Sequence, residues 1–591
     1  MMVWLWWLAP PPPAPVAEDA RPADTVLAVP SEPEPVEAPD VAETAPVDTA
    51  LAGAVEGTER FITVDSDLYT AVFSTRGATL RSLELKEYQM FDQQTPVQMV
   101  AESQTGALGL AFTTPSNHNV DSRTLYFDTA YEADTLYVRE QGAGISFLTQ
   151  LGGGTIRKTY SFEPGEYEIG LQIEQVDAEA FSTRDGYEIV WHGGVPFSED
   201  DPEDDARYSG AFARSGGEVE SVALDGEAEQ EKHLSGSVTW LTVKNKYFAA
   251  ILIPSGETRG AEIGGARVTD NAGSVVWEDY TARLLMPNAE GEVDQFRLYV
   301  GPMEFFRITD YRLGLYDVVD YGWDFFEWMV RPLAQYIFIP VFTFLSNFIP
   351  NYGLVIIVFS ILIKLVLHPL TKSSFHNMAR MRELQPQLQA VKEKFGDDPQ
   401  KQQAAMMKVY KETGVNPIGG CLPMLLQWPV IIALWQFLPQ SLEIRQQGFL
   451  WADDLSAPDA ILHLPFEIPF YGSFVAGFTL LMGISMIVQM KLQSAPATNP
   501  QAKMMIYVFP VIIFMFFNRL ASGLSLYYLC YNVLTALQQK LVNRSIEKQK
   551  NEKDGAVNGR AGKEEVKRLS GRRPEKVRGK GASPRRARSR R

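Results

Sequence analysis

Cysteine is nearly absent from this sequence. Only Cys421 and Cys530 occur in 591 residues, and both lie in apolar runs. This argues against a disulfide framework or a zinc site and is typical of buried small hydrophobic residues. The chain also lacks a Gly-x-Ser-x-Gly motif, a Walker loop and a His-Glu-x-x-His motif. We therefore predict no catalytic residues, no metal and no cofactor, and we do not expect an enzyme.

Positive charge is scarce over most of the chain and gathers at its end. The net charge is −18, yet Leu541–Arg591 carries 18 Lys and Arg against 6 Asp and Glu. The end of the chain therefore suits a polyanion or an anionic surface, and the acidic remainder does not. We expect residues 546–591 to be a basic disordered tail.

Composition divides the first half of the chain into three parts. Residues 1–9, MMVWLWWLA, are apolar but cover only about 13 Å as a helix, against a hydrocarbon core of about 30 Å. We interpret them as part of a truncated first transmembrane helix, and the Pro-rich and acidic residues 10–57 as a disordered linker. Residues 58–305 alternate apolar and polar residues between Gly, Asp, Asn and Pro, which predicts an all-β sandwich domain.

Apolar runs dominate the second half. Residues 306–350 are rich in Trp and Tyr and are interrupted by Pro332 and Pro340, which favours helix lying at a membrane interface. Five later segments, within a transmembrane core of residues 351–545, are apolar enough to span. They are Leu354–Leu370, Cys421–Leu438, Phe470–Met490, Met504–Phe517 and Gly523–Val542. The fourth, at roughly 21 Å as a helix, requires shielding by its neighbours or a locally thin bilayer.

Charge in the loops predicts the orientation. Eight Lys and Arg lie between Lys372 and Lys411, whereas the loop after the second apolar segment is acidic. The positive-inside rule places the segment Lys372–Lys411 and the tail in the cytoplasm, and the β-domain on the other side of the membrane. Apolar residues recur every three or four positions from Met378 to Phe395, and QKQQAAMMKVYKET follows a GDDP turn. Residues 373–415 are therefore predicted to be a cytoplasmic helical hairpin.

A lysine interrupts the first of the five segments. Ser360, Lys364 and His368 recur every four residues and share one helix face. A charge at mid-membrane is costly, so Lys364 either extends its side chain toward the cytoplasmic edge or faces a water-filled cavity. Polar residues on the other segments favour the cavity, although each alone is typical of an interhelical hydrogen bond. These residues are Gln427, Ser485, Gln489, Ser525, Tyr528, Asn532, Thr535 and Gln539.

Three stretches resemble one family. NPIGGCLPMLLQWPVIIALW begins at Asn416, FPVIIFMFFNRLASGLSLYYLCYNVLTALQQ at Phe509, and HPLTKSSFHNMARMRELQP at His368. Over about residues 325–545 they resemble the YidC-type membrane protein insertases. The β-domain, ending in YVGPMEFF, resembles the large periplasmic domain of the Gram-negative members. The resemblance implies a periplasmic β-supersandwich joined to an α-helical bundle of five transmembrane helices with a cytoplasmic hairpin.

The resemblance also implies a mechanism and its residues. A charged groove attracts the hydrophilic outer segment of a nascent membrane protein, while the apolar segment slides along the lipid-facing side. Many members have an arginine where this sequence has Lys364. The implied groove residues are Lys364, Ser360, His368, Gln427, Gln489, Tyr528 and Asn532. The implied slide residues are Met424, Leu425, Pro429, Phe509 and Phe514, and the structural motif is Asn416, Pro417, Gly419, Gly420 and Pro423.

The expected partners follow from the same resemblance. They are nascent membrane proteins, the Sec translocon, the ribosome through the basic tail and the cytoplasmic hairpin, and anionic lipids, but not DNA. We expect a multi-pass protein of the bacterial inner membrane that acts alone or with Sec. Two alternatives stay open from the residues. One is an ion-coupled transporter that uses Lys364 and His368 as a relay, although the segments show no internal repeat. The other is a ligand-binding β-domain with a membrane anchor.

Overall fold

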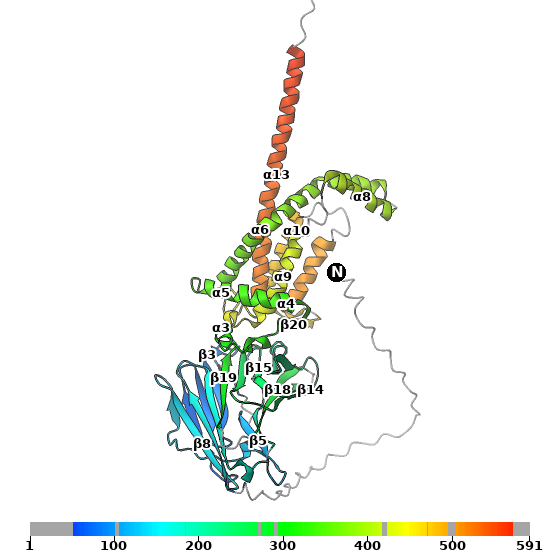
Figure 1. Ribbon diagram of the computed structural model, residues 1–591. Coiled ribbons are helices and arrows are strands. Elements are labelled where there is room, and N and C mark those ends of the chain that lie inside the picture. Colours follow the sequence, from blue (N-terminus) through cyan, green and yellow to red (C-terminus); the bar gives the residue numbers. More distant parts are fainter. Residues whose placement is uncertain are drawn as a thin grey trace, which may run out of the picture. The chain divides into compact units, whose positions relative to one another are not determined.

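The computed structural model describes residues 51–570, except 52, 101–105, 184, 270–273, 289–292, 323, 397, 416–421, 470 and 494–503. The predictions for residues 1–9, for most of the linker 10–57 and for residues 571–591 of the tail lie outside this range. Figure 1 shows the described chain as a β-domain followed by helices.

Three sheets form the β-domain in the described residues, and all neighbouring strands are antiparallel except β1 and β7. The first sheet has the order β4 (Pro96–Gln98), β3 (Thr79–Gln89), β2 (Tyr69–Ser74), β1 (Phe61–Asp65), β7 (Thr135–Tyr137). The second is β13 (Glu218–Val222), β12 (Gly210–Ser215), β15 (Val238–Lys244), β16 (Phe248–Pro254), β19 (Val293–Pro302), β10 (Glu168–Val176), β9 (Gly154–Phe162), β8 (Ala143–Leu151). The third is β14 (Glu229–Ser235), β17 (Gly260–Thr269), β18 (Val275–Met286), β11 (Tyr187–Trp191), β5 (Gly109–Thr113), β6 (Asn119–Asp121).

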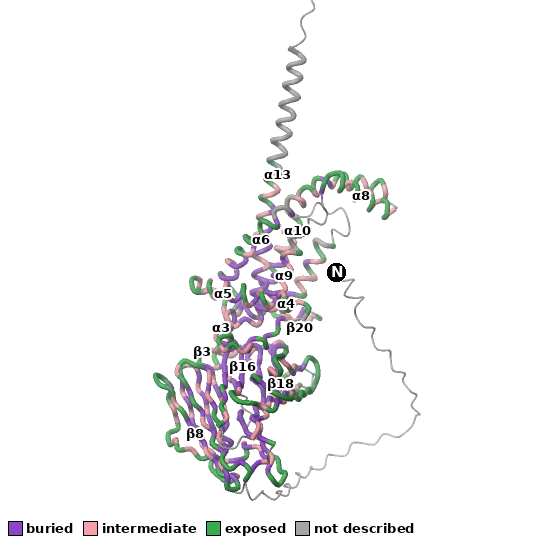
Figure 2. Tube along the Cα trace, in the orientation of Figure 1, coloured by how far each residue is buried: buried purple, intermediate pink, exposed green. Residues whose placement is uncertain are grey.

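Alternation along the strands builds the core between the sheets. In β9 and β10 every second residue is buried, which is the period of a strand with one face in a core. The second and third sheets contact each other through β15 with β18 and β12 with β17. Figure 2 shows the buried residues gathered inside the β-domain and among the helices. The predicted β-rich domain is confirmed.

His192, just after β11, makes the β-domain sensitive to acid. Burial, with a smaller contribution from Arg123 and against an opposing one from Asp121, lowers the pKa of His192 to about 4. Because the unfolded chain binds a proton near pH 6.5 and the folded chain only near pH 4, the free energy of unfolding falls as the pH drops through this window. The loss amounts to about 3 kcal/mol at most.

We therefore expect His192→Gln to flatten the acid side of the stability profile. Denaturant unfolding of the full chain, followed by circular dichroism between pH 4 and 7, measures this difference. Asp205, whose pKa is raised by burial to about 6, titrates in the same window, so only the difference between the two chains reports on His192. Identical slopes for the two chains would contradict this account.

The second half consists of helices, with one further hairpin. The helices of the membrane part and its approach are α3 (Phe305–Thr309), η3 (Leu315–Val318), α4 (Asp324–Leu333), a π-helix (Ala334–Phe338), α5 (Ile339–Ser346), α6 (Tyr352–Glu383), α7 (Gln385–Lys394), α8 (Pro399–Thr413), α9 (Leu422–Phe437), α10 (Gly477–Gln493), a π-helix (Met504–Val508), α12 (Phe509–Phe517) and α13 (Ser522–Ser570). Shorter helices are α2 (Pro202–Ala206) and the 3-10 turns Ser122–Thr124, Ala178–Ala180, Leu438–Gln440 and Leu442–Ile444. The strands β20 (Ala460–Ile468) and β21 (Gly472–Ala476) form the hairpin.

Two described helices, Phe325–Ser346 and Tyr352–Thr371, have the length and apolar character to cross a membrane. A shorter apolar helix covers Gly477–Leu492. The first was interpreted from sequence as interfacial, and Figure 1 shows α4 running across the ends of the other helices. Phe325 and Trp328 of α4 are exposed. The interfacial placement therefore stays a prediction.

Three boundaries predicted from the sequence are wrong. Among the described residues of Phe470–Met490, the helix begins only at Gly477, because the Asn518 side chain makes three hydrogen bonds to the backbone of residues 471–476 and Gly472–Ala476 forms a strand. The apolar pattern from Met378 to Phe395 is not one helix. It breaks at Leu384, because Pro386 in the first turn of α7 lacks a backbone donor.

The tail is the third correction. Residues 546–570 were predicted to be disordered, whereas α13 continues to Ser570. This stretch is rich in Glu, Lys, Gln and Arg, which are good helix formers, and contains no proline before Pro574. Composition alone did not separate a charged helix from a disordered tail.

A buried joint connects the β-domain with the loop after α9. The Arg445 guanidinium is buried and lies 2.8 Å from Glu199, and it donates a hydrogen bond of 2.7 Å to the Gln89 carbonyl. It also lies over the rings of Tyr247 and Phe248, at 5.3 and 5.4 Å from their centroids. The charge of this arginine is thus satisfied entirely by β-domain groups.

Two further contacts complete this joint. The Tyr247 hydroxyl donates to the Pro439 carbonyl at 2.6 Å, and Gln446 donates to the carbonyls of Gln89 and Met90. Within the β-domain, Asp205 accepts hydrogen bonds from the backbone of Ser198 and Glu199 and so positions the partner of Arg445. The joint is therefore built from buried, directional contacts.

Candidate functional site

Lys364 lies inside the helices and not at their edge. Its side chain on α6 is buried, and Nζ donates a hydrogen bond of 2.6 Å to the Thr535 hydroxyl on α13. The same nitrogen lies 4.2 Å from the centroid of the Tyr531 ring, one turn earlier on α13. Thr535 in turn donates to the Tyr531 carbonyl at 2.7 Å. This geometry favours the inward-facing interpretation of Lys364 over an extension to the cytoplasmic edge.

The two residues that share the face of Lys364 differ in their contacts. Ser360 is fully buried, and its hydroxyl donates to the Ile356 carbonyl of its own helix at 2.7 Å. His368 is exposed, and its Nδ1 lies 2.9 Å from the amide of Gln538 on α13. Lys364 and His368 therefore both face α13, whereas the Ser360 hydroxyl is occupied within α6.

The polar residues along α13, among them Ser525, Asn532 and Thr535, face two helices. Asn532 donates to Ser485 on α10 at 3.0 Å, and Ser525 lies 2.8 Å from the Thr479 hydroxyl, also on α10. Thr535 instead faces α6 through Lys364. Asn532 therefore makes an interhelical hydrogen bond to Ser485, the alternative stated for single polar residues, while Lys364 contacts the same set of polar residues on α13 through Thr535.

The remaining groove residues take different positions. Gln489 is half-buried on α10, one turn beyond Ser485. Tyr528 packs its ring against Phe517, with centroids 5.3 Å apart. Gln427 is buried on α9.

Several buried polar side-chain atoms on α9 and α13 have no hydrogen-bond partner among the described residues. They are Nε2 of Gln427, the hydroxyl of Tyr527, and the Oε1 atoms of Gln538 and Gln539. Tyr527 stacks on Tyr531, the ring that contacts Lys364, with centroids 6.3 Å apart. Buried polar groups in proteins are hydrogen-bonded to protein or water, so these atoms mark positions for water or a polar guest.

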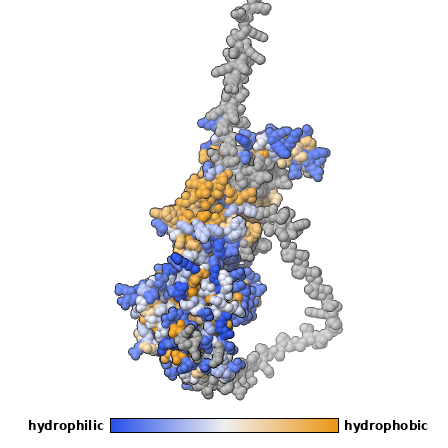
Figure 3. Space-filling model, viewed as in Figure 1, coloured by the Kyte–Doolittle hydropathy of each residue, from blue (hydrophilic) through white to orange (hydrophobic). Residues whose placement is uncertain are grey.

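The predicted slide residues lie on α9 and α12. Leu425 is exposed, Pro429 and Phe509 are half-buried, and half-buried Phe514 packs on the Tyr471 ring. Figure 3 shows the hydrophobic surface gathered over the helices next to the β-domain. The side chains of Met424 and Pro423, and residues Asn416, Pro417, Gly419 and Gly420, lie outside the described range.

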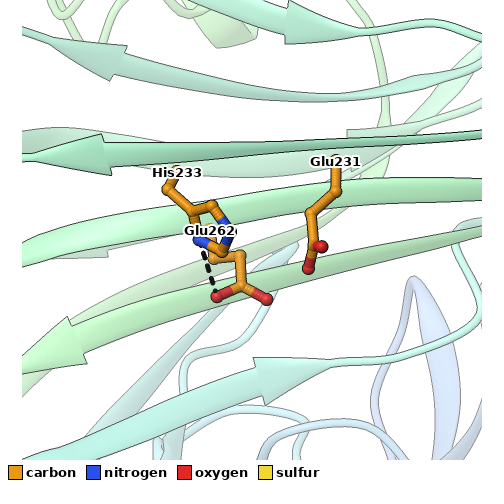
Figure 4. Close-up of side chains that lie close together, drawn as sticks. All are labelled: Glu231, His233 and Glu262. Carbon is orange, nitrogen blue, oxygen red and sulfur yellow. Dashed lines mark ion pairs between the residues drawn. The ribbon is translucent and has the colours of Figure 1, made fainter.

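A cluster of Glu231, His233 and Glu262 lies on one face of β14 and β17 (Figure 4). His233 pairs with Glu262 in the strand register and lies 3.1 Å from its carboxylate. Arg283 on β18 lies 3.5 Å from the same carboxylate and compensates its charge. These exposed pairs form a cross-strand charge ladder, and we assign no metal to them.

Comparison with known proteins adds to this geometry. The family model "60Kd inner membrane protein" matches residues 344–550, and "YidC periplasmic domain" matches residues 61–336. A "Membrane protein insertase YidC" of Chlorobium phaeovibrioides is 39% identical over 553 residues, covering 92% of this chain and 93% of the relative. The chain belongs to the YidC family of membrane protein insertases. A second YidC relative, from Chlorobium luteolum, is 38% identical and covers 83% of this chain and 84% of its own length.

A crystal structure titled "Active YidC insertase crystal structure with the first transmembrane domain resolved" covers 82% of this chain and 92% of its own, at 18% identity and a TM-score of 0.33. At that score the family assignment rests on the sequence relatives and family models. The chain is thus a membrane protein insertase of a YidC type with a periplasmic β-domain, and the transporter alternative is not favoured.

The sequence missed some of the residues that contact the YidC-type site. Tyr531 forms the ring beneath Lys364, and Thr479 pairs with Ser525. Tyr531 lies four residues before Thr535 and thus on the same helix face, which was a usable signal. Arg445 lies in the loop that the sequence described only as acidic, because its partner Glu199 lies far away in the sequence.

Proposed function

We propose that this chain inserts nascent membrane proteins through a hydrophilic groove whose positive charge is Lys364. The position of Lys364 carries the proposal, because the ammonium is held among the helices by Thr535 and Tyr531. A hydroxyl and a ring stabilise an ammonium without carrying charge themselves. An acidic outer segment of a client is attracted to this site more strongly than in bulk water, because the surrounding helices lower the effective dielectric constant.

Water is the second part of the proposal. The orphaned polar atoms of Gln427, Tyr527, Gln538 and Gln539 support a hydrated groove around Lys364. Hydration keeps the lysine protonated and lets a polar segment enter without losing all of its solvent. The substitution of lysine for the arginine of many members keeps the charge and gives up the planar fork that binds a carboxylate through two hydrogen bonds.

The apolar part of a client follows the outside of α9 and α12. The slide residues Leu425, Pro429, Phe509 and Phe514 belong to these helices, and Val511 and Phe516 add exposed apolar surface on α12. Burial of the client's apolar segment in lipid provides the driving force, so no nucleotide is consumed. The helical length from Met504 to Phe517 is short for a bilayer, which favours local thinning beside the slide.

The topology in this proposal has five crossings, α6, α9, α10, the Met504–Phe517 helix and α13. The helices α7 and α8 contact each other and form the cytoplasmic hairpin. The basic end of α13 and the tail lie in the same compartment, where they contact ribosomal RNA phosphates or anionic lipid. The Sec translocon is a proposed partner for clients that need both.

Site-specific photocrosslinking tests the groove. A photoreactive residue at Asn532 or Leu425 is expected to crosslink to a stalled nascent membrane protein, the first with its polar outer segment and the second with its apolar segment. The same residue at Tyr137, which is exposed on β7 far along the sequence, serves as the control. Crosslinks from Tyr137 with none from Asn532 or Leu425 would contradict the groove.

Removal of the β-domain is a further prediction. Deleting residues 61–302 should leave insertion of most clients within about threefold of the intact chain, because the proposed groove lies entirely in the helices. Complementation of insertase-depleted cells, together with membrane abundance of the truncated chain, measures this effect. Loss of insertion at normal abundance would place an essential step in the β-domain.

A further inference from the structure

The hairpin of β20 and β21 stands alone in the described structure. The two strands pair only with each other, and the register shifts between Ala460 and Leu462 and between His463 and Ile468. A two-stranded hairpin without a third strand is at best marginally stable in water. Something else therefore supports this hairpin.

The exposed side chains of β20 are largely apolar. Ile461 and Leu462, at the register shift, are 52% and 57% exposed. Phe466, further along β20, is 61% exposed. A solvated hairpin normally exposes polar side chains, so these three residues mark an interaction surface.

Buried hydrogen bonds fix the base of the hairpin to the membrane helices. Asn518, between α12 and α13, accepts from the Ala476 backbone at 2.9 Å and donates to the carbonyls of Tyr471 and Phe474. Asp459 accepts from the Phe478 backbone at 2.7 Å and so caps the start of α10. The hairpin is held firmly at the ends of α10 and α12.

An interfacial tryptophan lies beside it. Trp451 stacks on Phe478 with centroids 4.4 Å apart and donates to Asp459 at 2.8 Å. A Cβ added to Gly477 would lie 2.6 Å from the Trp451 nitrogen and 2.9 Å from Ile461, so the three residues meet at one point. Trp in such a position is typical of a membrane–water boundary.

The low net charge of the hairpin and the continuity of its apolar surface with α10 favour lipid as the partner of this surface. Glu467, the only acidic residue of β20, pairs with Arg519 at 2.6 Å, so the hairpin offers little net charge to a charged protein. Its apolar surface continues along the chain into the exposed Leu480, Leu481 and Ile484 of α10. The same α9–α10 connection contains Arg445, which contacts the periplasmic β-domain, so the hairpin is on the periplasmic side.

We infer that the β20–β21 hairpin lies in the interface of the outer leaflet, where it anchors the periplasmic ends of α10 and α12 in lipid. The depth follows from the backbone. The outer edges of a two-stranded sheet have unpaired amide and carbonyl groups, which require water or lipid headgroups and exclude the hydrocarbon core. The apolar side chains of β20 reach the upper acyl chains from this position.

Depth-dependent quenching tests the inference on the full chain. An environment-sensitive fluorophore is attached to Phe466→Cys, or to Leu462→Cys nearer the start of β20, in a chain that also contains Cys421→Ser and Cys530→Ser. The protein is reconstituted into phosphatidylcholine–phosphatidylglycerol vesicles. Quenchers are lipid nitroxides in the headgroup region, lipid nitroxides deep in the acyl region, and aqueous iodide. Tyr137→Cys, which is 66% exposed on the β-domain, provides the matched control.

The expected result is a loss of emission from both hairpin labels with headgroup nitroxides and shielding from iodide, with the reverse at residue 137. Quenching of the hairpin labels by iodide at the level of the control would overturn the inference. Protection from all three quenchers would also overturn it, because a protein surface would then cover the hairpin. Stronger quenching by the deep nitroxide would contradict the interfacial depth. Insertion of a client by each labelled chain confirms that it is folded.

Discussion

Replacing Lys364 with glutamate is expected to reduce insertion of clients with acidic outer segments by about tenfold or more. The reversal converts an attraction at about 4 Å into a repulsion, and at an effective dielectric constant of about 20 each is worth up to about 4 kcal/mol. Lys364→Arg keeps the charge and should stay within about threefold of the natural chain. Lys364→Ala removes the charge and should lie between the two. Insertion of a reporter client into vesicles containing each variant measures these effects.

The control for Lys364 is a charge reversal elsewhere. Lys232 on β14 is exposed and pairs with Glu220, so Lys232→Glu changes the net charge equally without touching the groove or the cytoplasmic hairpin. It should leave insertion nearly unchanged. Abundance in the membrane separates a folding defect from a functional one. Full activity of Lys364→Glu at normal abundance would remove the electrostatic role of this residue.

Arg445→Ala should destabilise the folded chain at the joint between the β-domain and the α9–α10 loop by about 3–5 kcal/mol. The variant leaves the Glu199 carboxylate without its guanidinium partner, while the Gln89 carbonyl keeps the hydrogen bond from Gln446, at a site where the Arg445 and Glu199 side chains are only 3% and 12% exposed. An uncompensated buried carboxylate is one of the few single changes that destabilise a protein this strongly. Thermal unfolding in detergent, with limited proteolysis of residues 438–447, measures the loss.

The chain contains a matched exposed pair. Arg519 lies 2.6 Å from Glu467, but these side chains are 50% and 69% exposed, so Arg519→Ala should cost less than about 1 kcal/mol. The double variant Arg445→Met with Glu199→Gln should recover part of the loss, because no charge is then left buried. Equal effects of Arg445→Ala and Arg519→Ala would contradict the buried joint.

The chain that lacks residues 61–302 tests the Arg445 and Lys364 predictions against each other. Arg445 faces solvent once its β-domain partners are gone, so Arg445→Ala should have little effect in that background. Lys364→Glu should keep its full effect there, since its contacts with Thr535 and Tyr531 lie within the helices. The comparison separates the joint from the groove.

Period and composition predicted most of the architecture. Alternation in strands such as β9 and β10 reflects burial of one face, and it indicated the β-domain correctly. The long apolar runs form α6, α9, α10, α12 and α13, because a helix satisfies the backbone hydrogen bonds of a long apolar stretch internally. The prediction of a helix over residues 471–476 was wrong because their apolar residues suit a spanning helix and an exposed hairpin equally, and Asn518, distant in the sequence, decided between them.

The site was predictable to the level of a helix face and no further. Spacing placed Lys364 on the face that the structure turns toward α13, because four residues are close to one helical turn. Spacing does not encode which polar group lies opposite. Asn532 therefore pairs with Ser485, and Lys364 with Thr535, according to how α6, α10 and α13 pack. The Arg445–Glu199 joint depends on two loops in different domains and left no pattern in the sequence.

The central claim is that the charge at residue 364 acts on the charge of the client. The most direct measurement compares two clients that differ only in the sign of a short outer segment, each inserted by the natural chain and by Lys364→Glu. The account predicts that Lys364→Glu inserts the acidic client poorly and recovers much of the insertion of the basic client. Equal loss for both clients would contradict it and would reduce Lys364 to a packing and hydrogen-bonding residue of α6.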